Sequence, residues 1–118
     1  MPHMLLIHEP IGQRATRSDA EGRAAYERML RWGEELKERG LLLAAESLAS
    51  TESAVRVTVP AGKARIVDGP FAEAKEMVGG FFMVNVVSRD EAIALAAECP
   101  AAEWATVEVR ALAPCFMR

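Results

Sequence analysis

The stretch Val67-Asp68-Gly69-Pro70-Phe71-Ala72-Glu73 constrains the fold of this chain more than any other segment. Asp68 followed by Gly69 is typical of a tight turn, because glycine reaches positive φ without steric cost and aspartate tolerates such positions. Pro70 has no N–H to give to a returning strand, and its ring disfavours the helical region for Gly69. The chain is therefore expected to leave a sheet here, with the Asp68 carboxylate at the end of a strand. That carboxylate has two interpretations, a structural Asx-type turn or a group that does chemistry.

The composition predicts one globular domain, residues 1–118. The chain is 51% hydrophobic and 26% charged with a net charge of −3, which is typical of soluble proteins. Only 6% of the residues are aromatic and the basic residues are interspersed, so nucleic acid is not an expected partner. The apolar runs fall far short of the ~20 residues of a membrane span, and the first residues lack the features of a secretory signal. The isolated Cys99 and Cys115 fit a reducing compartment. We expect a cytoplasmic protein that does not associate with membranes.

The hydrophobic periodicity predicts six strands and two helices. The predicted strands cover residues 3–8, 41–47, 53–59, 64–67, 81–87 and 105–112. The helices are expected after Ser18, ending at Gly40, and after Ser88, ending before Pro100, and each begins with a serine that a glutamate follows three residues later, as in a capping box. The segment from Asp68 to Gly80 is predicted to be a loop. This order, β-α-β-β-α-β with an inserted hairpin, indicates an α+β fold of the ferredoxin-like type, an antiparallel sheet with two helices on one face.

The face of the sheet that the helices leave open is expected to be covered by a second copy of the chain. Residues 5–7 and 81–87 are apolar on both sides of the strand, apart from Asn85, which is typical of central strands covered on both faces. Two helices cover only one face, and the other would present apolar sheet to water. A homodimer, sheet against sheet, is therefore predicted.

Four polar residues on otherwise apolar strands are candidates for a ligand cavity: Glu46, Asn85, Glu108 and Arg110. In one interpretation a glutamate and the arginine merely neutralise each other. In the other they line a cavity in which Arg110 binds a carboxylate or phosphate. Because Glu108 and Arg110 alternate with two valines that must face the helices, we expect both to face the space between the sheets.

A second candidate group lies near the Asp68 turn. His8, at a strand end, is either a surface residue or a group that relays a proton with Asp68. Gly69 and Glu73 are the candidate ligand-binding residues of this loop. His3 and His8 point to opposite faces of one strand and cannot share a metal, so no metal site is expected. The common nucleotide, hydrolase and zinc-protease motifs are absent, and no cofactor is expected.

At these residues the chain resembles the YCII-related family, in particular its DGPF branch. The resemblance lies in Met4-Leu5-Leu6-Ile7, Gly40-Leu41-Leu42, the stretch from Val67 to Glu73 with Lys75-Glu76 and Gly79-Gly80-Phe81-Phe82, and Val107-Glu108-Val109-Arg110. It implies a ferredoxin-like fold assembled as a dimeric α/β barrel, similar to muconolactone isomerase. A His–Asp active site has been proposed for some relatives, with the histidine on the first helix. Residues 19–39 contain no histidine here, so only Asp68 carries over. Members of the DGPF branch are often encoded beside extracytoplasmic-function sigma factors, which implies a sigma-factor-linked pathway.

Two hypotheses of function follow. In the first, the chain is a small-molecule-binding or regulatory protein whose ligand is a small anionic metabolite bound near the DGPF loop and the dimer cavity. In the second, it is a small cofactor-independent enzyme, an isomerase, lyase or hydrolase, with Asp68 as general acid and base. The missing helix histidine and the absence of a recognisable nucleophile favour the first.

Overall fold

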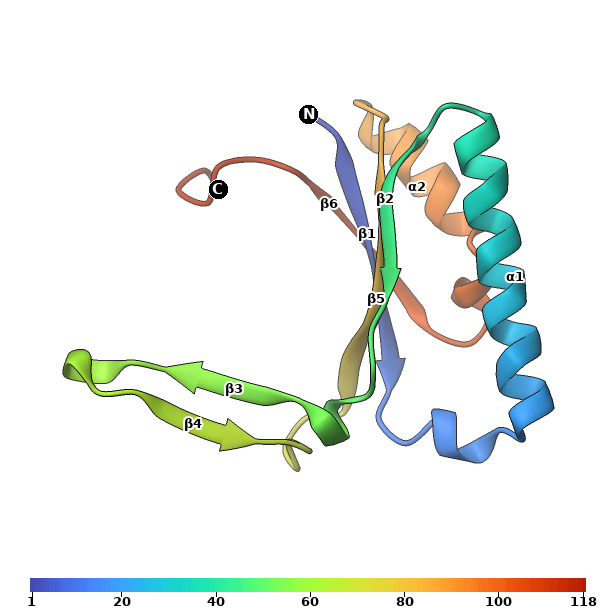
Figure 1. Cartoon of the computed structure of the whole chain (residues 1–118). Coiled ribbons are helices and arrows are strands. Elements are labelled where there is room, and N and C mark those ends of the chain that lie inside the picture. Colours follow the sequence, from blue (N-terminus) through green and yellow to red (C-terminus); the bar gives the residue numbers. More distant parts are fainter.

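The computed structural model describes all 118 residues and contains a four-stranded antiparallel sheet of strand order β2-β5-β1-β6, with both helices on one face (Figure 1). A separate two-stranded hairpin, β3-β4, stands apart from this sheet. The strands are β1 (His3–Pro10), β2 (Leu42–Ser47), β3 (Val55–Thr58), β4 (Arg65–Asp68), β5 (Glu76–Val84) and β6 (Thr106–Ala111); the helices are α1 (Asp19–Glu38) and α2 (Arg89–Glu98). Short 3-10 turns are η1 (Arg14–Thr16), η2 (Thr51–Ser53), η3 (Pro60–Gly62) and η4 (Pro100–Glu103). The predicted α+β class, the ferredoxin-like order and the inserted hairpin are confirmed.

The core lies between the helices and one face of the sheet. Side chains of β1 alternate, and every second one is buried on the helix side: His3, Leu5, Ile7 and Glu9. Trp32 of α1 meets Phe82 of β5 edge to face, with ring centroids 4.8 Å apart. The His3 ring is buried, with Nδ1 2.9 Å from the carbonyl oxygen of Val86, so this histidine belongs to the core. Neither helix is long and apolar enough to cross a membrane.

The helix boundaries follow the expected capping signals with one difference. Ser18 and Glu21 form the complete capping box, each accepting the other's backbone N–H. At α2 the Ser88 hydroxyl accepts from the Glu91 N–H, but the Glu91 side chain returns no bond, so the predicted second box is only half formed. Gly40, at φ +72°, follows the end of α1 in the left-handed conformation that glycine adopts readily.

The predicted loop from Asp68 to Gly80 is too long, because β5 begins at Glu76. Gly79 and Gly80 therefore lie inside a central strand and do not form a turn. A Cβ on Gly79 would lie 2.8 Å from the Glu9 carboxyl carbon, and one on Gly80 would lie 2.8 Å from the Glu46 carbonyl oxygen. The glycine pair marks a close approach of neighbouring groups to the strand.

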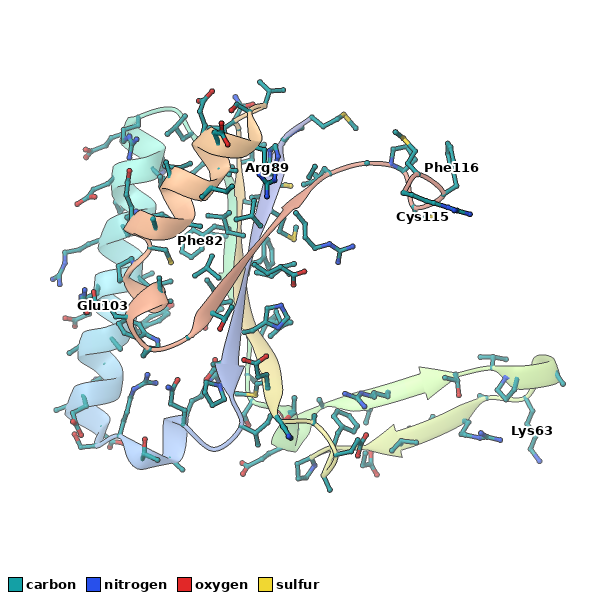
Figure 2. All side chains as sticks on the ribbon, turned by 180° about the vertical axis from the view of Figure 1, so that it is seen from behind. Lys63, Phe82, Arg89, Glu103, Cys115 and Phe116 are labelled. Atoms are coloured by element: carbon teal, nitrogen blue, oxygen red, sulfur yellow. The ribbon has the colours of Figure 1, made fainter.

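The other face of the sheet carries no helix. Half-buried Met4, Leu6 and Met83 lie on it, together with exposed Thr106, Glu108 and Arg110 of β6. The hairpin and the C-terminal segment both project on this side, from opposite ends of the sheet (Figure 1). Figure 2 shows Lys63 at the far end of the hairpin and Phe116 on the C-terminal segment, both remote from Phe82 in the core. The radius of gyration is 16.1 Å, whereas a compact chain of this length has about 13.5 Å. The molecule thus has an open, concave side.

Candidate functional site

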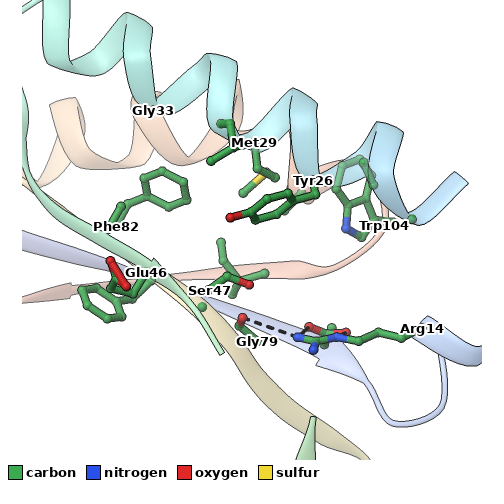
Figure 3. Close-up of a pocket in the computed structure, with 18 of the residues that line it drawn as sticks. Arg14, Tyr26, Met29, Gly33, Glu46, Ser47, Gly79, Phe82 and Trp104 are labelled. Atoms are coloured by element: carbon green, nitrogen blue, oxygen red, sulfur yellow. Dashed lines mark hydrogen bonds and ion pairs between the residues drawn. The ribbon is translucent and has the colours of Figure 1, made fainter. Parts of the chain in front are cut away.

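A cavity of about 610 Å³ lies between α1 and the helix-facing side of the sheet (Figure 3). Its apolar wall comes from Met29 of α1, from Leu42 and Ala45 of β2, and from Phe82 of β5. The Tyr26 ring lies across the middle of the cavity, and Trp104 closes one end. A cavity of this size and apolar character is typical of small-molecule sites.

An ion pair between a buried carboxylate and a half-buried arginine forms the polar floor at one end. Glu9, 7% exposed, accepts from Arg14 Nε at 2.9 Å and from Arg14 Nη2 at 2.7 Å. The same Nη2 lies 3.5 Å from the Gly79 carbonyl oxygen. A carboxylate on the buried face of a strand needs such a partner, because an unpaired buried charge is strongly destabilising. The pair therefore fixes η1 against the glycine segment of β5.

Sequence reasoning missed this pair, although a signal was present. The predicted first strand ends at residue 8, but β1 continues to Pro10, and alternation places Glu9 on the same face as Leu5 and Ile7. An acidic residue on that face predicts a nearby cation, and Arg14 is the first basic residue that follows.

Arg17 lies beside the same end of the cavity and has no carboxylate partner. Its guanidinium carbon is 5.6 Å from the centroid of the Trp104 ring, and its only side-chain hydrogen bond is to Gln13 Oε1 at 3.4 Å. Arg28 also contacts Trp104, 5.4 Å from its centroid, but Arg28 is paired with Glu103. That pairing raises the pKa of Arg28 and lowers the pKa of Glu103. Arg17 is thus the cation at this end of the cavity that makes no ion pair within the chain. The pKa of the nearby Glu21 is lowered mainly by its hydrogen bond from the Ser18 backbone N–H and in smaller part by the charge of Arg17.

This arrangement favours binding over catalysis. The hydroxyl groups of Tyr26 and Ser47 line the cavity without a hydrogen-bond partner in the chain and can bond to a ligand. Three carboxylates line the cavity: Glu9 has both oxygens occupied by Arg14, whereas Glu34 and Glu46 make no ion pair. No cluster of three or more potential metal ligands is found. The site therefore suits a molecule with an apolar body and an anionic group.

The polar strand residues predicted to line one cavity are dispersed. Glu46 lies at the rim of the cavity beneath α1, whereas exposed Asn85 lies just beyond the end of β5. Glu108 pairs with His8, whose Nε2 is 2.6 Å from Glu108 Oε1. Arg110 therefore has no glutamate partner in the chain. Glu108 and Arg110 do lie on the helix-free face, as their alternation predicted.

The loop that follows β4 packs against the hairpin. Asp68 is exposed at the end of β4, and a hollow of about 370 Å³ beside it is lined largely by exposed residues. The Arg56 guanidinium lies 3.7 Å from the centroid of the Phe71 ring and donates to Glu73 at 3.4 Å. His8 bonds to Glu108, and no hydrogen bond joins it to Asp68, so the chain does not form the proton relay considered from the sequence.

Gly69 has a different structural role from the one predicted. Its φ is not positive, so glycine is not needed here for the left-handed conformation. Its N–H donates to the Ala54 carbonyl oxygen at 2.7 Å, and the Gly69–Pro70 peptide is cis. A Cβ at this position would collide with the carbonyl oxygen of Thr51 and lie 3.2 Å from that of Ala54. Glycine is therefore required here by close packing.

Comparison with known proteins places this architecture in a family. The YCII-related domain matches residues 1–115. An uncharacterised protein of Rhizobium meliloti (strain 1021) is 38% identical over 78 residues, which cover 64% of this chain and 63% of the relative. The matched segment thus spans less than two thirds of that relative's length. Because the family match extends over almost the whole sequence, the chain belongs to the YCII-related domain family.

Proposed function

We propose that this YCII-related protein binds a small anionic molecule with an apolar body in the cavity beneath α1. The observation that carries the proposal is the position of Arg17 at the end of a cavity of about 610 Å³, beside an ion pair that is already neutral. A carboxylate or phosphate at this end gains a charge-assisted hydrogen bond, while the apolar body displaces water from Met29 and Phe82.

The hollow beside Asp68 is less suited to this role. The side chains around it are mostly exposed, and its Arg56 already pairs with Glu73. The ligand class expected from the sequence is therefore retained, while the proposed site moves to the helix side of the sheet.

The test is a binding screen of small carboxylates and phosphates, read by thermal shift and followed by calorimetry. Loss of one charge-assisted hydrogen bond costs about 1.5–3 kcal/mol, so Arg17→Gln should weaken binding roughly ten- to hundredfold. Arg23→Gln removes an exposed arginine of α1 outside the cavity and should leave affinity unchanged. Arg14 is unsuitable for the test because its substitution would leave the buried Glu9 carboxylate without a partner. Absence of any ligand response, or equal affinity in the Arg17→Gln variant, would overturn the proposal.

Fluorescence offers a second readout. The chain has two tryptophans, of which Trp104 lines the cavity and Trp32 lies in the core. Ligand binding should change the emission of the parent protein, and Trp104→Phe should remove most of that change.

We also propose a homodimer joined through the helix-free face. The isolated chain exposes 8206 Å². A compact monomer of its mass exposes about 6,300 Å², so roughly 1,900 Å² is in excess. A standard interface buries about 800 Å² on each partner, and the excess is more than twice that. Light scattering at micromolar concentration should give the mass of two chains, and a monomer would contradict the proposal.

A further inference from the structure

The β3-β4 hairpin, here called the arm (residues 55–68), has one apolar face with nothing packed on it. Its two strands pair only with each other, with Val57 opposite Ile66 and Thr58 opposite Arg65. The register places Val55, Val57 and Ile66 on one face, with Asp68 at its base, and Arg56, Thr58 and Arg65 on the other, together with Val67. Val57 is 58% exposed and Ile66 is 65% exposed. An isolated two-stranded hairpin is marginally stable in water, so a hairpin with this pattern is expected to cover its apolar face.

The four-stranded sheet of the same chain does not cover the apolar face of the arm. The arm projects away from the four-stranded sheet on the side opposite the helices (Figures 1 and 2). The loop after β4, residues 69–73 and here called the bracing loop, holds it there. Phe71 is 8% exposed and lies under the Arg56 guanidinium, which also donates to Glu73. These contacts engage the polar face of the arm and leave the apolar face free.

The length of the arm matches a second copy of the chain. The seven residue steps from Ala54 to Ala61 extend about 23 Å at 3.3 Å each. Two sheets packed face to face lie about 10 Å apart, so an arm that leaves one sheet passes the partner's sheet and reaches its helix layer. The same partner would cover the helix-free face. That face carries apolar Met4 and Leu6 beside Glu108, which pairs with His8, and Arg110, which makes no ion pair within the chain.

We infer that the arm packs its apolar face on the partner subunit, and that the bracing loop fixes the angle at which it does so. The inference rests on the homodimer proposed above. By two-fold symmetry each subunit gives one arm and receives one. The segment Asp68 to Glu73 therefore acts in assembly. The excess exposed area, too large for a standard interface alone, fits a dimer that buries both the sheet face and the arm.

Adjacent substitutions on opposite faces of the arm test the inference. Val57→Asp places a charge on the apolar face, and Thr58→Asp places the same charge on the polar face one residue away. Light scattering over a dilution series should show the first variant as a monomer and the second as a dimer like the parent. Circular dichroism should show both folded, because neither position packs against the core cluster. A monomeric parent protein would defeat the dimer itself. If the parent and the Val57→Asp variant are both dimers, the role of the arm is refuted while the dimer itself stands.

A second pair of variants tests the bracing loop. Arg56→Gln removes the contacts with Phe71 and Glu73, and should raise the dimer dissociation constant roughly tenfold or more. Arg65→Gln, on the same face but without a hydrogen-bond partner, should not. Equal dissociation constants for the two variants would remove the bracing role.

Direct contact is measured in dimers assembled from ¹³C-labelled and unlabelled chains. An isotope-filtered NOE experiment should connect the labelled methyl groups of Val57 and Ile66 to protons of the unlabelled chain. A dimer in which these methyl groups show contacts only within their own chain would overturn the inference.

Discussion

Gly79→Ala tests whether the glycine pair in β5 exists to accommodate the Glu9–Arg14 ion pair. A Cβ at this position would collide with Glu9 Oε1 and lie 2.8 Å from its carboxyl carbon and 3.0 Å from Arg14 Nη2. The Glu9 side chain can move away only by giving up its bidentate bond to Arg14, because both oxygens are engaged. The substitution therefore acts on the ion pair.

The magnitude follows from the burial of the carboxylate. Separating a buried charge from its partner costs about 3–5 kcal/mol. Alanine in a strand interior gains about 0.5–1 kcal/mol over glycine, so the net loss of unfolding free energy should be about 2–4 kcal/mol. For a domain of this size that corresponds to a fall in melting temperature of roughly 10–15 °C. Domains have about 5–15 kcal/mol in total, so the variant should still fold.

The assay is urea unfolding at fixed protein concentration, with Gly33→Ala as the matched control. A Cβ on Gly33 would meet Phe82 Cε2 at 3.6 Å, an ordinary contact, and alanine should stabilise the helix by up to ~1 kcal/mol. In a Glu9→Ala background the collision with Gly79→Ala disappears. The double-mutant cycle should then give a coupling energy of about 2 kcal/mol or more. If the losses of unfolding free energy in the two single variants add to that of the double variant within about 0.5 kcal/mol, the reasoning is refuted.

Three further predictions concern other parts of the chain. Gly69→Ala should destabilise by more than about 1 kcal/mol in thermal melts despite its ordinary φ, because its Cβ would meet the carbonyl oxygens that flank it. Burial raises the pKa of the Cys99 thiol, so an alkylating reagent at neutral pH should modify exposed Cys115 and spare Cys99 until the chain unfolds, as mass spectrometry would show. Arg28 lowers the folded-state pKa of Glu103, so their contribution is present at neutral pH and lost as the pH falls through that pKa; Glu103→Gln should slightly flatten the acid side of a melting-temperature profile.

The fold was predictable because its signals are local and mutually consistent. Strand alternation separated the helix-facing side of β1 from its open side, and the capping residue Ser18 set the start of α1. The two apolar segments became the two central strands, β1 and β5. Each of these assignments depends on the period of a single element, which a sequence displays directly.

The site was less predictable because its contacts join distant elements. A pair of adjacent glycines occurs in turns and in strands, and the sequence alone does not distinguish the two. The distinction comes from Glu9 on the neighbouring strand β1, whose side chain lies against Gly79. Arg17 became a candidate only once η4 brought Trp104 beside it. One interpretation of the sequence paired a glutamate of these strands with Arg110, whereas the neighbouring strand β1 supplies His8 as the partner of Glu108.

The missing helix histidine gains a physical meaning from this geometry. The residues that α1 presents to the cavity include Tyr26 and Met29 and no histidine. The carboxylate at the floor, Glu9, is committed to Arg14, and Asp68 lies exposed at the base of the arm. Acid–base catalysis requires a titratable group within hydrogen-bond reach of a bound substrate. In the cavity beneath α1, Arg17 and two hydroxyls can bind and orient an anion, while the carboxylates of Glu34 and Glu46 line the same cavity without an ion pair. The cation at one end of an apolar wall is the feature that favours a binding protein over an enzyme.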